Sequence, residues 1–276
     1  MRKMKQLTAV VSIVAIILFC SCGNDTDELN NKAEMLYKSK QYEEAITLLN
    51  KSVELDVKNN SRAYIGRAAC YFSIGEYSKS VEDYSSAIKS EPNNKELYFA
   101  RGKAYELSGD MMNAYADYSK ALNIDSLYFD ALNVRGSLAL KVEDIGLAIT
   151  DFSKVITYDS LNCIAYSNRS VALRKVKEFD LALADAKKAI SICPENASAY
   201  FSIGRIYADK NKYDEALYNM GLAIKLDSTN GVYYRSRAVV YLYMKRKDDA
   251  CKDLQIAKGL GDNAAHDLIV ENCSNM

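Results

Sequence analysis

Five arginines each stand 16 residues before an aspartate, and this is the most regular arrangement of charged groups in the sequence. The pairs are Arg67 with Asp83, Arg101 with Asp117, Arg135 with Asp151, Arg169 with Asp185, and Arg237 with Asp253. A guanidinium that faces a carboxylate forms a bidentate ion pair, whereas a row of unpaired arginines would suit an anionic ligand. We favour ion pairs, because a buried charge without a partner costs free energy.

The other polar residues show no enzymatic pattern. The chain has one histidine, His266, beside Asp267 on the expected polar side of a helix. A single histidine cannot build a multi-histidine metal site. There is no glycine-rich phosphate loop and no nucleophile elbow. We therefore expect a protein that is not an enzyme and that carries no cofactor and no metal.

A unit of 34 residues, repeated seven times, positions these charged groups. One row of small residues and a second row seven residues later mark the unit. The first row is Ala45, Ser80, Ala114, Ala148, Ala182, Ala216 and Ala250. The second is Ser52, Ala87, Ala121, Val155, Ala189, Ala223 and Ala257. Each unit is expected to hold two helices joined by a turn, and two prolines in 276 residues favour an almost wholly helical chain.

This unit resembles the tetratricopeptide repeat, with tyrosine or leucine in place of the usual tryptophan at Leu29, Tyr64 and their equivalents. The resemblance implies an all-α fold, an α-solenoid of about seven tandem helix-turn-helix repeats over residues 27–261. Residues 262–276 depart from the repeat. Asp262 can cap a helix there, with Leu268 and Ile269 on its apolar face, so we expect a closing helix over the last repeat.

The register of the repeat places the ion pairs inside single repeats. In an antiparallel hairpin the seventh and twenty-third positions lie nearly opposite. Repeats 1 and 6 lack both the arginine and the aspartate, with Leu48 and Asn219 at the acidic position. Pairing to the next repeat would instead match Leu48 with Arg67 and Asp185 with Ile203.

Four cysteines stand where hairpins bring helix ends together. Cys163 and Cys193 mark the two ends of the fifth hairpin, and Cys251 and Cys273 lie on the last repeat and the closing helix. Both pairs are possible disulfides, provided that their Cα atoms lie within about 7 Å. Cys70 is expected to be a buried free thiol.

The N-terminus has the pattern of an export signal. A basic start precedes an apolar run from Gln6 to Phe19, which is too short for a comfortable membrane span of about 20 residues. The stretch resembles a bacterial lipoprotein signal over residues 1–21. That resemblance implies lipidation of Cys22 and a tether of residues 22–26, and an uncleaved anchor or an ordinary signal peptide is the alternative. We expect an outer-membrane lipoprotein of the bacterial cell envelope, facing the periplasm or the cell surface.

The resemblance to the repeat family also implies a binding groove on the first helices. Its faces correspond to Phe99, Lys103, Asn133, Ser167, Arg174, Lys175, Phe201, Arg205, Arg235 and Leu242. The mixture of aromatic and basic groups would suit an acidic, partly apolar segment. The carboxylate clamp of chaperone-binding members is absent, because its positions hold Ile65, Ala69 and Phe99 among others.

We therefore expect a membrane-anchored scaffold that binds another protein or a peptide segment in this groove. An envelope or pilus assembly factor resembling pilotin lipoproteins is an alternative, and a surface lipoprotein that binds a glycan or nutrient is another. With 36 basic and 36 acidic residues, the chain has no charge excess that would favour nucleic acid.

Overall fold

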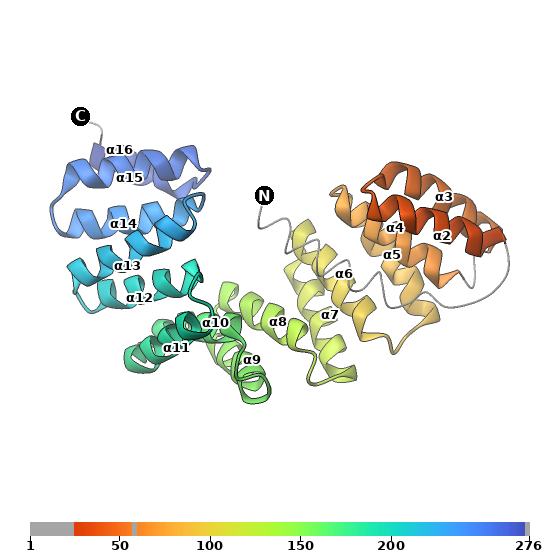
Figure 1. The fold of residues 1–276 in the computed structure, drawn as a ribbon, viewed down its shortest axis with the longest axis horizontal. Helices are drawn as coiled ribbons and strands as arrows, with labels where there is room; N and C mark the ends of the chain where they lie inside the picture. The colour runs from red at the N-terminus through yellow and green to blue at the C-terminus, as the bar shows by residue number, and fades with distance from the viewer. Residues whose placement is uncertain (1–24, 57–59, 274–276) are drawn as a thin grey trace. The chain divides into compact units, whose positions relative to one another are not determined.

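The computed structural model describes residues 25–56 and 60–273, and these residues are helical apart from short turns. The all-α fold class expected from the sequence is confirmed, with the helices packed as paired helix-turn-helix repeats (Figure 1). The helices are α2 (Asp25–Lys38), α3 (Tyr42–Leu55), α4 (Ser61–Ser73), α5 (Tyr77–Ser90), α6 (Lys95–Ser108), α7 (Met111–Ile124), α8 (Phe129–Lys141), α9 (Ile145–Tyr158), α10 (Cys163–Lys175), α11 (Phe179–Ile192), α12 (Ala197–Asp209), α13 (Tyr213–Leu226), α14 (Gly231–Tyr243), α15 (Lys247–Gly259) and α16 (Ala264–Cys273).

The chain divides into two compact units, residues 1–138 and 139–276, and the boundary falls within α8. In the first unit α2 pairs with α3, α4 with α5, and α6 with α7. In the second unit α10 pairs with α11, α12 with α13, and α14 with α15, while α16 packs on α15. Each hairpin also packs on its neighbours in the same unit, as the repeat pattern predicts.

Small side chains let the two helices of a hairpin approach closely. A Cβ atom added to Gly102 would come within 2.7 Å of the Tyr118 ring, and one added to Gly204 would come within 2.7 Å of Met220 Cγ. Tyr118 and Met220 are fully buried and fill the space that the glycines leave. Both glycine positions are therefore required by packing rather than by backbone conformation.

Polar residues at the helix ends satisfy the free N–H groups of the first turn. Asn60, Asn162 and Asn196 each accept a hydrogen bond from the backbone N–H three residues later, at 3.0 to 3.1 Å. Between the two helices of a hairpin, one residue has a positive φ; it is Gly75 or Gly109 in two hairpins and a non-glycine residue in the others. These caps and turns fix where each helix begins and ends.

Helix α16 lies where the closing helix is expected. Asp262 Oδ1 accepts the N–H of Ala264 at 3.2 Å, and Ala265 is fully buried in a cluster with Leu254. At the other end, α2 begins at Asp25, inside the predicted tether of residues 22–26. Asp25 and Asp27 lie in its first turn, where acidic groups stabilise a helix N-terminus.

Candidate partner-binding surface

The first helices of the repeats in the second unit lie side by side. Helix α12 packs against α10 on one side and α14 on the other, in addition to its own partner α13. Side chains from α10, α12 and α14 therefore share one surface, which we call the first-helix surface. Seven of the predicted groove residues come from these three helices: Ser167, Arg174, Lys175, Phe201, Arg205, Arg235 and Leu242.

Two arginines on the first-helix surface already have carboxylate partners. Arg174 on α10 pairs with Asp209 at the end of α12, with 2.6 Å between Nη1 and Oδ2. Arg235 on α14 pairs through Nε with Asp262 Oδ2 at 2.7 Å, so the turn before α16 holds it in place. These pairs fix the two guanidinium groups on either side of Arg205.

Arg205 differs from both neighbours. Among the residues that the structure describes, its guanidinium has neither an ion pair nor a hydrogen bond, and its one aromatic contact is the Phe201 ring at 5.8 Å. The side chain is half-buried. Burial lowers the pKa of Arg205, nearby Arg174 and Arg235 lower it further, and Asp209 partly offsets them. The site is thus positively charged and lacks an acceptor.

A cleft of about 380 Å³ opens beside this arginine. Arg205 and Asp209 of α12 line one side, and Arg235, Val239 and Tyr243 of α14 line another. Tyr243 is 68% exposed. Its ring stacks parallel on that of Tyr213, with 5.9 Å between the ring centroids. The cleft therefore combines guanidinium groups with an accessible aromatic face.

The predicted aromatic groove residues pack more deeply than expected. Phe99 is only 1% exposed, and its ring lies against those of Tyr118 and Tyr128 at 5.8 and 5.1 Å. Phe201 is half-buried against Tyr233 at 4.6 Å. The prediction that Phe99 faces an open groove is wrong, because tyrosines that follow it along the chain cover its ring.

The remaining groove predictions have mixed outcomes. Ser167 is 3% exposed and therefore does not offer an open surface, although its Oγ has no hydrogen-bond partner among the described residues. Lys175 is exposed, and Leu242 packs against the cluster beneath α16. In the first unit Lys103 is largely covered, with its Nζ 3.6 Å from Glu106. Asn133 is half-buried with its Oδ1 unpartnered.

The structure pairs four of the five arginine–aspartate couples within their own hairpins. Arg67 with Asp83, Arg101 with Asp117, Arg169 with Asp185 and Arg237 with Asp253 each form two parallel hydrogen bonds of 2.7 to 2.8 Å. Arg135 lies in the first unit and Asp151 in the second, so the fifth pair stays a prediction. These paired arginines have their acceptors and are not a row of free anion-binding groups.

The arginines also hold the preceding hairpin, which the sequence analysis missed. Nη1 of Arg67 donates to Asn50 at 2.7 Å. The equivalent nitrogen donates to Ser85 from Arg101, to Ser119 from Arg135 and to Ser153 from Arg169, at 2.9 to 3.1 Å. A hydroxyl or amide recurs at this position wherever the next repeat has the arginine, except at Gly221 before Arg237. This periodic polar residue was the available signal.

Burial changes the acidic partners. The pKa of Asp117 is raised above its ordinary value, because burial disfavours its charged form more than the hydrogen bond from Arg101 favours it. The pKa of Asp83 is raised for the same reason. The ion pair therefore offsets a desolvation cost and adds little net stability beyond it.

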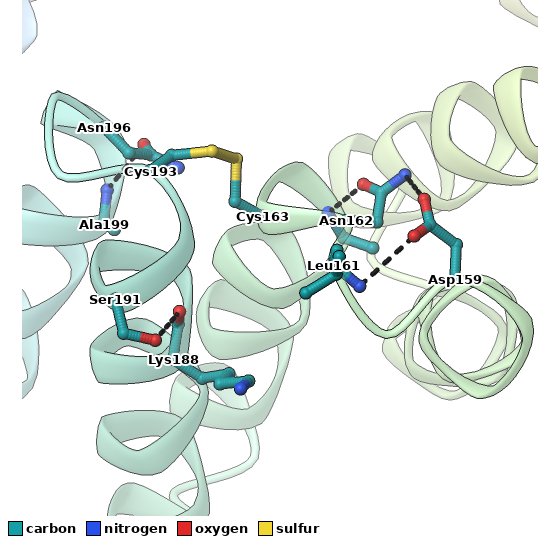
Figure 2. Close-up of a disulfide and its surroundings, with 10 residues drawn as sticks. Asp159, Leu161, Asn162, Cys163, Lys188, Ser191, Cys193, Asn196 and Ala199 are labelled. Carbon is teal, nitrogen blue, oxygen red and sulfur yellow. Dashed lines mark hydrogen bonds between the residues drawn. A yellow bond between two sulfur atoms is a disulfide. The ribbon is translucent and has the colours of Figure 1, made fainter.

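Both possible disulfides are formed. Cys163, the first residue of α10, is bonded to Cys193 directly after α11, with Cα atoms 6.1 Å apart (Figure 2). Cys251 of α15 is bonded to Cys273 of α16, with Cα atoms 5.8 Å apart. Cys70 is a buried free thiol whose pKa is raised by burial to about 12. The covalent links therefore belong to the second unit.

Two further searches covered residues 25–56 and 60–273. No cluster of three or more histidine, cysteine or acidic residues there could hold a metal ion. None of the described helices combines the length and the apolar character needed to cross a bilayer. The predicted signal peptide and Cys22 lie outside the described residues.

Comparison with known proteins identifies the repeat. A TPR repeat model matches residues 68–109, and tetratricopeptide repeat models match residues 29–59, 95–126 and 186–218. Over 66 residues the chain is 30% identical to heat shock protein STI1 of Saccharomyces cerevisiae, a match that spans 24% of this chain and 11% of the yeast protein.

Solved structures share the fold. A tetratricopeptide repeat protein from Parabacteroides merdae superimposes with a TM-score of 0.79 at 19% identity, covering 90% of this chain and 98% of that one. YrrB, described as a TPR protein with an unusual peptide-binding site, gives a TM-score of 0.56 at 21% identity over 72% of this chain and 97% of its own. The chain is therefore a tetratricopeptide repeat protein.

Proposed function

We propose that this protein is a membrane-anchored scaffold that binds a segment of a partner protein on the first-helix surface of its second unit. The cleft beside Arg205 is the observation that carries the proposal, because it joins basic groups to the exposed face of Tyr243. Aromatic and arginine side chains commonly dominate protein interfaces. The repeat family and the peptide-binding site named for YrrB support this role.

The exposed tyrosines provide a matched test of the surface. Tyr243 on α14 borders the cleft and is 68% exposed, whereas Tyr218 on the second helix α13 is 69% exposed and does not line it. After crosslinking in cells, Tyr243→Ala should reduce the recovered partner about tenfold, which corresponds to about 1.4 kcal/mol. Tyr218→Ala should leave recovery unchanged. Equal losses, or none, would place binding elsewhere.

The anchor rests on the N-terminal sequence. Only Gly23 and Asn24 separate Cys22 from α2, so lipidation of Cys22 would hold the first repeat close to the bilayer. Cys22→Ala should move the folded protein from the membrane fraction to the soluble fraction. A variant that remains in membranes would contradict anchoring through this cysteine alone.

A further inference from the structure

The strongest unexplained feature of the first-helix surface is a guanidinium without an acceptor. Four other arginines on the repeats' seventh position are satisfied by aspartates, and Arg174 and Arg235 each have a carboxylate. Arg205 alone among these half-buried arginines has none, although it lines an open cleft. A partly desolvated cation costs free energy unless something pairs with it.

The surroundings of Arg205 define the group that would complete it. The nearest cations, Arg174 and Arg235, hold Asp209 and Asp262 respectively, so the acidic residues nearby are already engaged. The cleft is lined on another side by Val240 and by the stacked rings of Tyr213 and Tyr243. An anionic group beside an apolar side chain therefore matches both the charge and the lining.

We propose that Arg205, assisted by Arg235, binds the carboxylate of an aspartate or glutamate side chain in the partner, with a neighbouring apolar residue against Tyr243. This inference rests on the proposed function, and it names the chemistry of the bound segment. A carboxylate can accept two parallel N–H bonds from Arg205 in the geometry that the internal arginine–aspartate pairs already show. Depression of the Arg205 pKa by burial and by its two neighbours agrees with a site prepared for an anion.

A randomised library of twelve-residue peptides, displayed on phage with their C-termini fused, tests this proposal. Fusion removes the free C-terminal carboxylate, so only side chains can supply the charge. Peptides selected on the purified protein should share an aspartate or glutamate at one fixed position next to an apolar residue. Exchanging that acidic residue for its amide should raise the Kd at least tenfold, measured by fluorescence anisotropy of labelled synthetic peptides.

Substitution of the protein then locates the contact. Arg205→Gln should raise the Kd of the acidic peptide about tenfold and should remove the penalty for the amide peptide. Lys188→Gln, the same charge change on an exposed position of α11, should leave both values unchanged. Arg205→Gln should not lower the melting temperature, since Arg205 has no internal acceptor to lose. Arg205→Lys keeps the charge and should retain part of the preference, which guards against a change in shape alone.

The possible results separate the two proposals. If peptides are selected but wild type and Arg205→Gln discriminate acid from amide equally, the carboxylate assignment is wrong while segment binding stands. Selected peptides without a shared acidic residue would overturn the assignment in the same way. If no peptide is enriched on the wild-type protein, both the assignment and the proposed function are contradicted.

Discussion

Gly221→Ser should complete the one arginine contact between hairpins that the sequence leaves open. Four arginines donate from Nη1 to a serine or asparagine of the preceding hairpin. Arg237 bonds Asp253 through Nε and Nη2. Gly221 of α13 stands at the position of the missing acceptor. A Cβ atom added there would lie 4.0 Å from Arg237 Nη1 and within 4 Å of no other group outside its own helix, so a serine fits.

Two contributions set the expected size of the effect. Serine is better than glycine inside a helix by about 0.5 kcal/mol. A hydrogen bond adds about 0.5–1.5 kcal/mol, and the partly exposed setting places this one near the lower end. Gly221→Ser should therefore stabilise the protein by about 1–1.5 kcal/mol. Gly221→Ala gains only from helix propensity, about 1 kcal/mol, because it supplies no acceptor.

Urea unfolding followed by circular dichroism measures the difference. In the wild-type background Gly221→Ser should match or exceed Gly221→Ala. With Arg237→Met also present, the order should reverse by about 0.5 kcal/mol, since only propensity then remains. If serine falls below alanine by the same margin in both backgrounds, Arg237 does not use the added hydroxyl, and the account of arginine contacts between hairpins is wrong.

Three further predictions concern the packing and covalent links of the repeats. Asp117→Leu alone should cost about 3–5 kcal/mol because it strands the Arg101 guanidinium, whereas Asp117→Leu with Arg101→Met should be nearly neutral; chemical denaturation gives both values, and additive losses would refute the pairing argument. Phe99→Ala should lower stability by about 3–5 kcal/mol, as expected for a fully buried ring, and an unchanged melting temperature would contradict its burial. Cys163→Ser should cost about 3–4 kcal/mol, since the disulfide closes a loop with a sequence separation of 30, and the lost bond should appear as one additional free thiol in the denatured, unreduced protein.

The sequence was sufficient to predict the hairpins and most of their internal pairs. Small residues such as Gly102 recur because two helices meet there, so their period of 34 residues reports the packing directly. Arg101 and Asp117 occur together because each is costly to bury alone. Both signals come from contacts inside one repeated unit, and repetition makes such contacts visible in a single sequence.

The candidate site was only partly predictable, because it depends on contacts outside the repeat pattern. Phe99 occupies a groove position, yet Tyr128 beyond its own hairpin covers the ring. Arg235 obtains its carboxylate from Asp262, which lies after the last repeat. The isolation of Arg205 could not be read from its position, since it results from Asp209 and Asp262 being engaged by other arginines. The disulfides likewise needed Cα separations that sequence spacing does not give.

Site-specific photo-crosslinking in cells tests the central claim most directly. A benzophenone amino acid would replace Tyr243 on the first-helix surface or, as the matched control, Tyr218 on α13. The account predicts one dominant crosslinked partner from position 243, competed away by the peptide selected on the purified protein, and no such product from position 218. The same crosslinked partner from both positions, or from position 218 alone, would contradict partner binding on the first-helix surface.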